Sequence, residues 1–156
     1  PGVGGHCIAV DPWFIASETP EEAKLITLAR RVNDGKSDWV VEEIIGKVKS
    51  HPRKGVKNIL CLGLAFKPNI DDLRESPARK IVETVALSGV GNVFVVEPHI
   101  SELPKSLAGK AELIGLEQGL ALADIAVILV AHSDFDSDLI RNETQLLIID
   151  TCGLLH

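Results

Sequence analysis

The sequence predicts an α/β fold, in which a doubly wound parallel sheet follows long central helices. From about Val56 onward, short apolar runs alternate with helical segments, and the expected strands are KNILCLGL, NVFVVEP, AELIG, DIAVILVA and QLLIID. Continuously apolar strands are typical of a parallel sheet that is covered on both faces. Right-handed crossovers between such strands give a Rossmann-like sandwich.

The segments between these strands carry helix signals. SPARKIVETVALSG predicts a helix that Ser76 caps, that Pro77 opens and that Gly89 ends. EQGLALA and SDLIRN predict two shorter helices. The order of strands and helices therefore fits the predicted sheet with helices on both faces.

Helical spacing also marks the first third of the chain. A helix is expected after Asp11, whose side chain is placed as an N-cap in front of a proline. A second helix is expected to begin at Thr19, with Glu22 completing a capping box, and to end at Gly35. A third is expected from Trp39 to the SHPRKG segment.

These elements divide the chain into two predicted parts. Residues 1–55 hold a glycine-rich loop and the central helices, and residues 56–156 hold the sheet. Two long helices in front of a core are candidates for an oligomer seam, so we expect a homodimer through residues 19–50.

Composition excludes several classes of protein. The 156 residues carry a net charge of −6, which argues against a nucleic-acid surface, and no apolar run is long enough to span a membrane. The three cysteines are far apart and form no C-x-x-C pair, so we expect no metal site and a cytoplasmic protein with free thiols. The chain contains no methionine, and we expect it to be a fragment.

The glycine-rich start, PGVGGHCIAVDP, surrounds one thiol. Gly4 and Gly5 let backbone amides approach a ligand closely, and such amides could lower the pKa of the Cys7 thiol. A tight turn followed by a small buried cysteine is the equally weighted alternative. From its neighbours alone, Asp11 is expected to cap a helix rather than to be a catalytic group. His6 is a poor candidate for a general base, because adjacent side chains rarely face each other.

Ligands of doubly wound sheets bind beyond the carboxyl ends of the strands. There the sequence has GLAFKPNIDDLRES, Glu97–His99, AHSDF and DTCG. The first of these has Gly63 alone and no G-x-G-x-x-G turn. Its Lys67 and Arg74 suit a phosphate, although pairing with Asp71 and Asp72 is an alternative.

Three other residues can be interpreted from their sequence neighbours alone. Cys61 lies inside an apolar strand and is expected to be buried and inert. Cys152 follows the last strand and has no assigned role, and His132 is expected only to satisfy its acidic neighbours in HSDFD.

PGVGGHCIAVDPWF and GLAFKPNIDDLRESPA together resemble the UDP-glucose/GDP-mannose dehydrogenase family. The resemblance covers nearly the whole chain. The GGHC-I-x-VDP segment is similar to the branch that acts on UDP-N-acetylated hexosamines, with the manno epimer favoured over the gluco epimer. The resemblance implies an oxidoreductase that converts the C6 alcohol of the sugar to a carboxylate in two NAD-dependent steps, through a cysteine thiohemiacetal and thioester.

The resemblance also implies roles for individual residues. Cys7 matches the nucleophile, and Asp11 matches an aspartate that positions or activates water. The substrate-binding residues it implies are Gly4, Gly5, His6 and Lys67, and the cofactor-binding residue is Arg74. The sequence departs from the family where many relatives carry a basic residue after the last strand, because here Cys152 and Gly153 stand there.

The resemblance further implies that an NAD-binding domain precedes Pro1 in a longer protein, so that this chain alone is expected to be inactive. The longer protein is expected to contribute to surface polysaccharide. A non-catalytic nucleotide-binding or dimerisation module, in which Cys7 is structural, is the alternative from another class.

Overall fold

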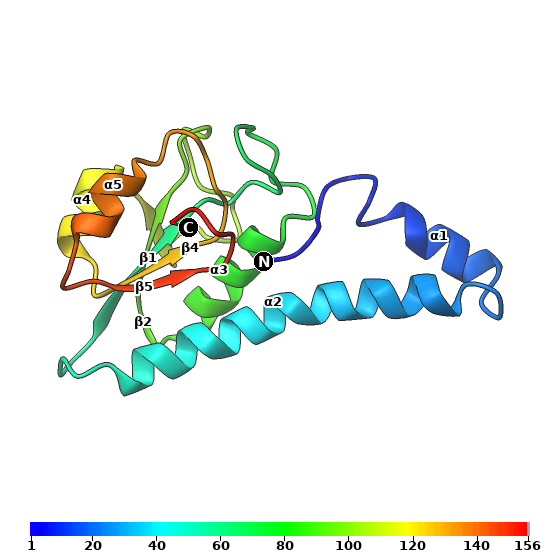
Figure 1. The fold of residues 1–156 in the computed structure, drawn as a ribbon, viewed down its shortest axis with the longest axis horizontal. Coiled ribbons are helices and arrows are strands. Elements are labelled where there is room, and N and C mark those ends of the chain that lie inside the picture. The colour runs from blue at the N-terminus through cyan, green and yellow to red at the C-terminus, as the bar shows by residue number, and fades with distance from the viewer. Residues whose placement is uncertain (156) are drawn as a thin grey trace.

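The computed structural model describes residues 1–155 and contains one five-stranded parallel sheet in the order β3-β2-β1-β4-β5 (Figure 1). The strands are β1 (Lys57–Leu62), β2 (Gly91–Val96), β3 (Ala111–Leu113), β4 (Ile125–Ile128) and β5 (Leu147–Asp150). The predicted α/β fold class is confirmed. The strand order reverses between β1 and β4, which makes this the ligand-binding edge expected of such a sheet.

Strand β1 explains why both faces of the sheet must be covered. Ile59 and Cys61 point into one buried cluster, whereas Leu60 and Leu62 point into the other. All four side chains are fully buried. The continuous apolar run in the sequence is therefore a strand at the centre of the sheet, with a core on each side.

Two layers of helices supply these cores (Figure 1). Helix α3 (Pro77–Ser88) and the second half of α2 (Lys24–Ser50) cover one face, and α4 (Leu116–Leu122) and α5 (Ser137–Asn142) cover the other. The Ser76 hydroxyl accepts a hydrogen bond from the Arg79 amide at 3.2 Å, and Gly89 is left-handed with φ +66°. Both predicted ends of α3 are thus confirmed.

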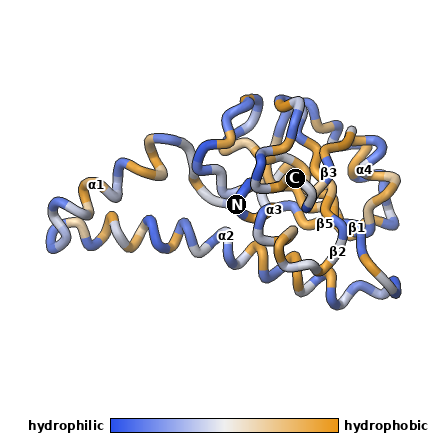
Figure 2. Tube along the Cα trace, turned by 180° about the vertical axis from the view of Figure 1, so that it is seen from behind, coloured by the Kyte–Doolittle hydropathy of each residue, from blue (hydrophilic) through white to orange (hydrophobic). Residues whose placement is uncertain are grey.

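The prediction that Gly35 ends a helix is wrong. Helix α2 runs without interruption through Gly35 and spans 27 residues. A glycine inside a helix costs only about 1 kcal/mol, and the burial of Val40, Val41, Ile44 and Val48 on the α/β core outweighs that cost. The first half of α2 extends beyond the sheet beside α1 (Asp11–Glu18), and apolar residues lie along both helices (Figures 1 and 2).

The predicted caps of these two helices are also wrong. Asp11 is the first residue of α1, and Val10 holds the N-cap position with no side-chain cap. The Asp11 amide donates to the Cys7 carbonyl at 2.8 Å, which draws Asp11 into the first helical turn. Thr19 does not cap α2, which begins at Lys24; its hydroxyl donates to Ile15 and closes α1 instead.

Within the described residues, no helix has the length and hydrophobicity that crossing a membrane requires. The division of the chain at residue 55 stays a prediction.

Replacing Gly35 and Gly89 by alanine tests this account of the helices. A Cβ at either position would have open space around it, so only the backbone conformation distinguishes the two sites. Gly35→Ala should raise the free energy of unfolding by about 0.5–1 kcal/mol, because alanine restricts the unfolded chain and suits a helix. Gly89→Ala should lower it by about 1–2 kcal/mol, because its φ of +66° is left-handed. Urea unfolding measures both, and a loss of stability in Gly35→Ala would contradict an unbroken α2.

Candidate functional site

The thiol loop, residues 1–10, lies against the β1–α3 loop, residues 63–76. A Cβ on Gly4 would clash with the carbonyl oxygen of Glu75, and one on Gly5 would lie 3.0 Å from the Phe66 ring. Gly5 also has a φ of +97°. The two glycines are buried and allow close contact between the loops. Packing of the loops therefore explains why glycine stands at both positions, without any contact to a ligand. Their predicted role in substrate binding stays a prediction.

Asn33 on α2 holds the thiol loop from the other side. Its carboxamide accepts a hydrogen bond from the Val3 amide at 2.8 Å and donates one to the Val3 carbonyl at 3.1 Å. Arg30, which is 9% exposed, donates to the same carbonyl and pairs with Asp34 at 2.8 Å. The main chain of the loop is therefore fixed on a rigid helix three and four residues before His6 and Cys7.

Cys7 is exposed, so the alternative of a small buried cysteine is wrong. Its carbonyl accepts hydrogen bonds from the amides of Val10 and Asp11, which places the thiol one turn before α1. Arg74 donates to Nδ1 of the neighbouring His6 at 3.3 Å. The hydrogen bond to Asp72 raises the pKa of Arg74. Cys7, His6 and Arg74 thus lie in one cluster.

The two cations of the β1–α3 loop differ in their partners. Arg74 forms a forked ion pair with Asp72, with nitrogen–oxygen distances from 2.6 to 3.1 Å, and these hydrogen bonds lower the pKa of Asp72 to about 2. Lys67 is exposed and has no ion pair within residues 1–155. The alternative of local pairing therefore holds for Arg74 and not for Lys67, whose charge is available to an anion.

A cavity of about 230 Å³ lies at the carboxyl ends of β1 and β4, where the strand order reverses. Phe66 and Lys67 from the β1–α3 loop line it together with Val130 and Cys152. Partial desolvation and the nearby charge of Asp150 raise the pKa of the Cys152 thiol to about 11, so this thiol is neutral at physiological pH. The cavity combines an aromatic ring, an unpaired cation and apolar walls, which suits a ligand with a flat ring and a phosphate.

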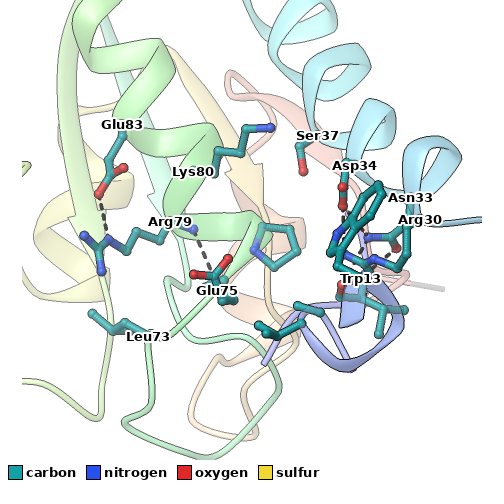
Figure 3. Close-up of a pocket in the computed structure, with 15 residues that line it drawn as sticks. Trp13, Arg30, Asn33, Asp34, Ser37, Leu73, Glu75, Arg79, Lys80 and Glu83 are labelled. Atoms are coloured by element: carbon teal, nitrogen blue, oxygen red, sulfur yellow. Dashed lines mark hydrogen bonds and ion pairs between the residues drawn. The ribbon is translucent and has the colours of Figure 1, made fainter. Parts of the chain in front are cut away.

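A larger cavity, of about 540 Å³, lies between the thiol loop, α2 and α3 (Figure 3). Trp13, Arg30, Asn33 and Asp34 form one wall, and side chains from α3 form the opposite wall (Figure 3). Its cations are matched by carboxylates in three pairs: Arg30 with Asp34, Arg79 with Glu83, and Lys80 with Asp38. The smaller cavity therefore fits a phosphate-bearing ligand better, because its lysine is free of such a partner.

A buried carboxylate organises the loops around the smaller cavity. Glu97, at the end of β2, accepts hydrogen bonds from the amides of Leu64 and Ala65 at 2.7 and 3.1 Å. His132, which follows β4, lies 3.1 Å from the same carboxylate oxygen, and both side chains are fully buried. Burial alone would raise the pKa of Glu97, but the hydrogen bonds from His132, Leu64 and Ala65 outweigh burial and lower it. Glu97 is therefore an ionised carboxylate inside the protein.

Glu97, His99 and His132 lie close enough together to hold a metal ion. Nδ1 of His132, however, accepts a hydrogen bond from the Asn69 amide at 3.0 Å, so Nε2 carries the ring proton and donates it toward Glu97. A histidine ligand needs a free lone pair, and its other nitrogen normally donates. The contacts of His132 therefore favour a hydrogen-bond network over a metal centre.

Several residues of this site carry no local signal in the sequence, or a misleading one. Asn33 and Arg30 gave no signal beyond polar positions on an amphipathic helix, although they hold the thiol loop. Glu97 and His132 were placed at the ligand edge, but the expectation that His132 serves only its acidic neighbours is wrong, because it contacts Glu97 and Asn69. Cys61 is buried as expected, and burial raises its pKa to about 12.

Residues 60–156 match the UDP-binding domain of the UDP-glucose/GDP-mannose dehydrogenase family. The chain belongs to this family. The match begins inside β1 and includes the β1–α3 loop, the Glu97–His132 pair and every residue after β1 that lines the smaller cavity. The resemblance inferred from the two sequence motifs is thus confirmed at the level of the family.

Known members cover the rest of the chain. The UDP-N-acetyl-D-mannosamine dehydrogenase of Escherichia coli is 48% identical over 99% of this chain, and an NDP-N-acetyl-D-galactosaminuronic acid dehydrogenase of Ralstonia solanacearum is 50% identical over 99%. The chain spans 38% and 36% of the length of these two family members.

Solved structures of family members have the same fold. The UDP-N-acetyl-mannosamine dehydrogenase of S. aureus superposes with a TM-score of 0.78 at 34% identity, over 99% of this chain and 35% of that protein. The corresponding enzyme of Pyrococcus horikoshii gives a TM-score of 0.73 at 30% identity, over 99% of this chain and 36% of that protein.

The buried charge of Glu97 predicts how stability depends on pH. Because the folded protein lowers the pKa of Glu97, this group stabilises the fold above its ordinary pKa, and the stabilisation is lost as the pH falls through the folded-state value. Glu97→Gln should cost about 1–3 kcal/mol at pH 7 and should make the loss of stability as the pH falls below 4.5 shallower. Urea unfolding across this range measures both effects, and parallel curves for the two proteins would contradict an ionised Glu97.

Proposed function

We propose that this chain is part of an NAD-dependent UDP-N-acetyl-D-mannosamine 6-dehydrogenase. Such an enzyme oxidises the C6 alcohol of the sugar to a carboxylate in two steps and releases UDP-N-acetylmannosaminuronate, a building block for surface polysaccharide. The observation that carries the proposal is the exposed Cys7, on a loop seated against Phe66 and Arg74 beside the cavity that Lys67 lines. The 48% identity to UDP-N-acetyl-D-mannosamine dehydrogenase supports this substrate.

The proposed role of Cys7 is covalent. After the first oxidation, its thiolate adds to the C6 carbonyl carbon, and the carbonyl oxygen of the resulting thiohemiacetal carries the negative charge or takes up a proton. Loss of a hydride from C6 and of the hydroxyl proton then gives a thioester. Water adds to the thioester, the carbon–sulfur bond breaks, and the thiolate is regenerated with the carboxylate. NAD, when bound, accepts the hydride in each oxidation.

Other residues have proposed supporting roles. Lys67 binds the phosphates of the substrate, and Asp11 at the start of α1 positions the attacking water. Gly4, Gly5 and His6 border the sugar, because they belong to the loop that carries Cys7. The β1–α3 turn has Gly63 as its single glycine and does not fit the pyrophosphate of NAD, so Arg74 is the one cofactor contact proposed within this chain. The remaining NAD contacts are assigned to other parts of the complete protein.

Three alternatives are kept, of which two differ in the sugar and one in the class of protein. UDP-N-acetylglucosamine is the alternative substrate suggested by the GGHC segment, and the match to an N-acetyl-D-galactosaminuronic acid dehydrogenase adds a third sugar. A non-catalytic nucleotide-binding or dimerisation module remains the alternative from another class. Three free cysteines agree with a cytoplasmic location.

Substitution of the thiol tests the catalytic proposal. In a complete protein that includes this chain, Cys7→Ser should reduce uronate formation from UDP-N-acetyl-D-mannosamine and NAD on the order of a thousandfold or more, since serine is a much weaker nucleophile. Cys61→Ala is the matched control, because that thiol is buried in the core, and its turnover should stay near that of the unmodified protein. NADH absorbance and product chromatography measure the reaction. Full turnover in Cys7→Ser would reject the covalent role of the thiol, whereas no turnover in the unmodified complete protein would favour the non-catalytic module.

We also propose that the complete protein forms a homodimer through residues 19–50. Leu25, Leu28 and Val32 recur at three- and four-residue steps on α2, so they share a face, and each is more than half exposed. Such a contiguous apolar stripe on a projecting helix is typical of an interface.

A charge on this stripe tests the dimer. Leu28→Glu should weaken dimerisation at least about tenfold, because the interface would bury an unpaired carboxylate. Leu122→Glu is the matched control, since Leu122 is a partly exposed leucine on α4, outside the proposed seam. Sedimentation over a concentration series measures both variants. Equal dimer dissociation constants for the two variants would count against residues 19–50 as the seam.

A further inference from the structure

The β1–α3 loop needs strong anchors to hold a ligand-binding side chain in place. It spans 14 residues without a helix or strand, and each ordered residue costs about 1–2 kcal/mol of backbone entropy. Its first anchor is Glu97, which binds the amides of Leu64 and Ala65. Lys67 lies only two residues beyond this anchor, so its position depends on what holds the loop on its other side.

The second anchor lies at Asn69. The Asn69 amide donates to Nδ1 of His132 at 3.0 Å, and its side-chain oxygen accepts hydrogen bonds from the amide and hydroxyl of Ser133 at 2.8 and 3.0 Å. Asn69 has a φ of +62°, a conformation that asparagine tolerates better than most residues. Lys67 is therefore held between two fixed points, at Ala65 and Asn69.

His132 joins the two anchors. Its ring is fully buried, and Nε2 binds the Glu97 carboxylate while Nδ1 binds Asn69. The ring also packs edge-on against Phe135, with centroids 5.3 Å apart, and lies 4.9 Å from the ring of His99. Because both ring nitrogens have hydrogen-bond partners and the ring packs against Phe135, the ring is held in a single orientation. It therefore connects Glu97, at the end of β2, to Asn69 in the β1–α3 loop.

We propose that His132 is a positioning residue, which fixes the main chain of Asn69 through Nδ1 and thereby holds Lys67 at the cavity between β1 and β4. The proposal rests on the proposed function of that cavity as the site of a UDP-sugar. His132 touches no ligand in this account; it acts on affinity through the loop.

Two substitutions separate the two hydrogen bonds of His132. In His132→Asn, the side-chain oxygen takes the place of Nδ1 and keeps an acceptor for the Asn69 amide, but the side chain is too short to reach Glu97. In His132→Gln, the side-chain amide takes the place of Nε2 and keeps the donor to Glu97, but the acceptor for Asn69 is lost. Each variant thus keeps one contact and loses the other.

The experiment compares these variants in the complete protein, with UDP alone as the probe. In His132→Gln, hydrogen exchange of the Asn69 amide should be about tenfold faster and the dissociation constant of UDP about tenfold higher. In His132→Asn, both quantities should stay within about threefold of the unmodified protein. The free energy of unfolding of His132→Asn should nevertheless fall by more than that of His132→Gln, because the hydrogen bond to Glu97 is lost. Exchange measured by NMR and titration calorimetry supply the two readouts.

The outcomes distinguish this proposal from the function on which it rests. Equal Asn69 exchange in the two variants, or UDP affinity in His132→Gln equal to that of the unmodified protein, would overturn the positioning role. An unmodified protein that does not bind UDP would overturn the proposed function, whereas the exchange comparison would still decide the Asn69 contact. If a variant fails to fold, nitrogen NMR of the unmodified protein decides instead: a proton on Nδ1 of His132 would overturn the proposal, and a proton on Nε2 would support it.

Discussion

The buried negative charge of Glu97 is the constraint on which the ligand edge of the sheet depends. A carboxylate removed from water is costly unless hydrogen bonds surround it. Leu64, Ala65 and His132 supply donors to one oxygen, and the amide of His99 donates to the other. These donors come from the ends of β1, β2 and β4, so satisfying one charge brings three loops together at the point where the strand order reverses.

The thiol loop depends in turn on the loop that Glu97 organises. Glu75 and Phe66 form the surface on which Gly4 and Gly5 lie, and this surface has the right shape only when the β1–α3 loop is ordered. Asn33 then holds the same segment from α2. The exposed thiol is therefore positioned by two independent supports, one from the sheet and one from the long helix, which is a precise way to place a side chain on a loop.

Elements with local signals were predictable from the sequence. The central strands appeared as apolar runs, and Ser76 and Gly89 marked the ends of α3, because capping and left-handed turns involve only neighbouring residues. The local rule failed at Gly35, where burial of the second half of α2 against the sheet outweighs the cost of one glycine. The capping prediction failed at Thr19, because its hydroxyl donates a hydrogen bond to the carbonyl of Ile15 in the preceding helix.

The site was predictable only in part. The motifs singled out the segments that carry Cys7, Lys67 and Arg74, and the structure brings Cys7 and Arg74 into one cluster. The pairing of Glu97 with His132 crosses 35 residues and depends on β2 and β4 flanking the same central strand, which no local pattern encodes. The same holds for Asn33 and Val3, which are 30 residues apart.

The continuity of α2 couples the thiol loop mechanically to the α/β core. Its second half is clamped on the core at Ile44, and Asn33 holds the thiol loop eleven residues earlier, about 16 Å along the axis. By geometry, a tilt of about 4° at the clamp displaces Asn33 by about 1 Å, a shift that can change a reaction rate about a hundredfold. Because α2 continues through Gly35, a tilt of its outer half displaces Asn33 and, with it, the main chain of Val3.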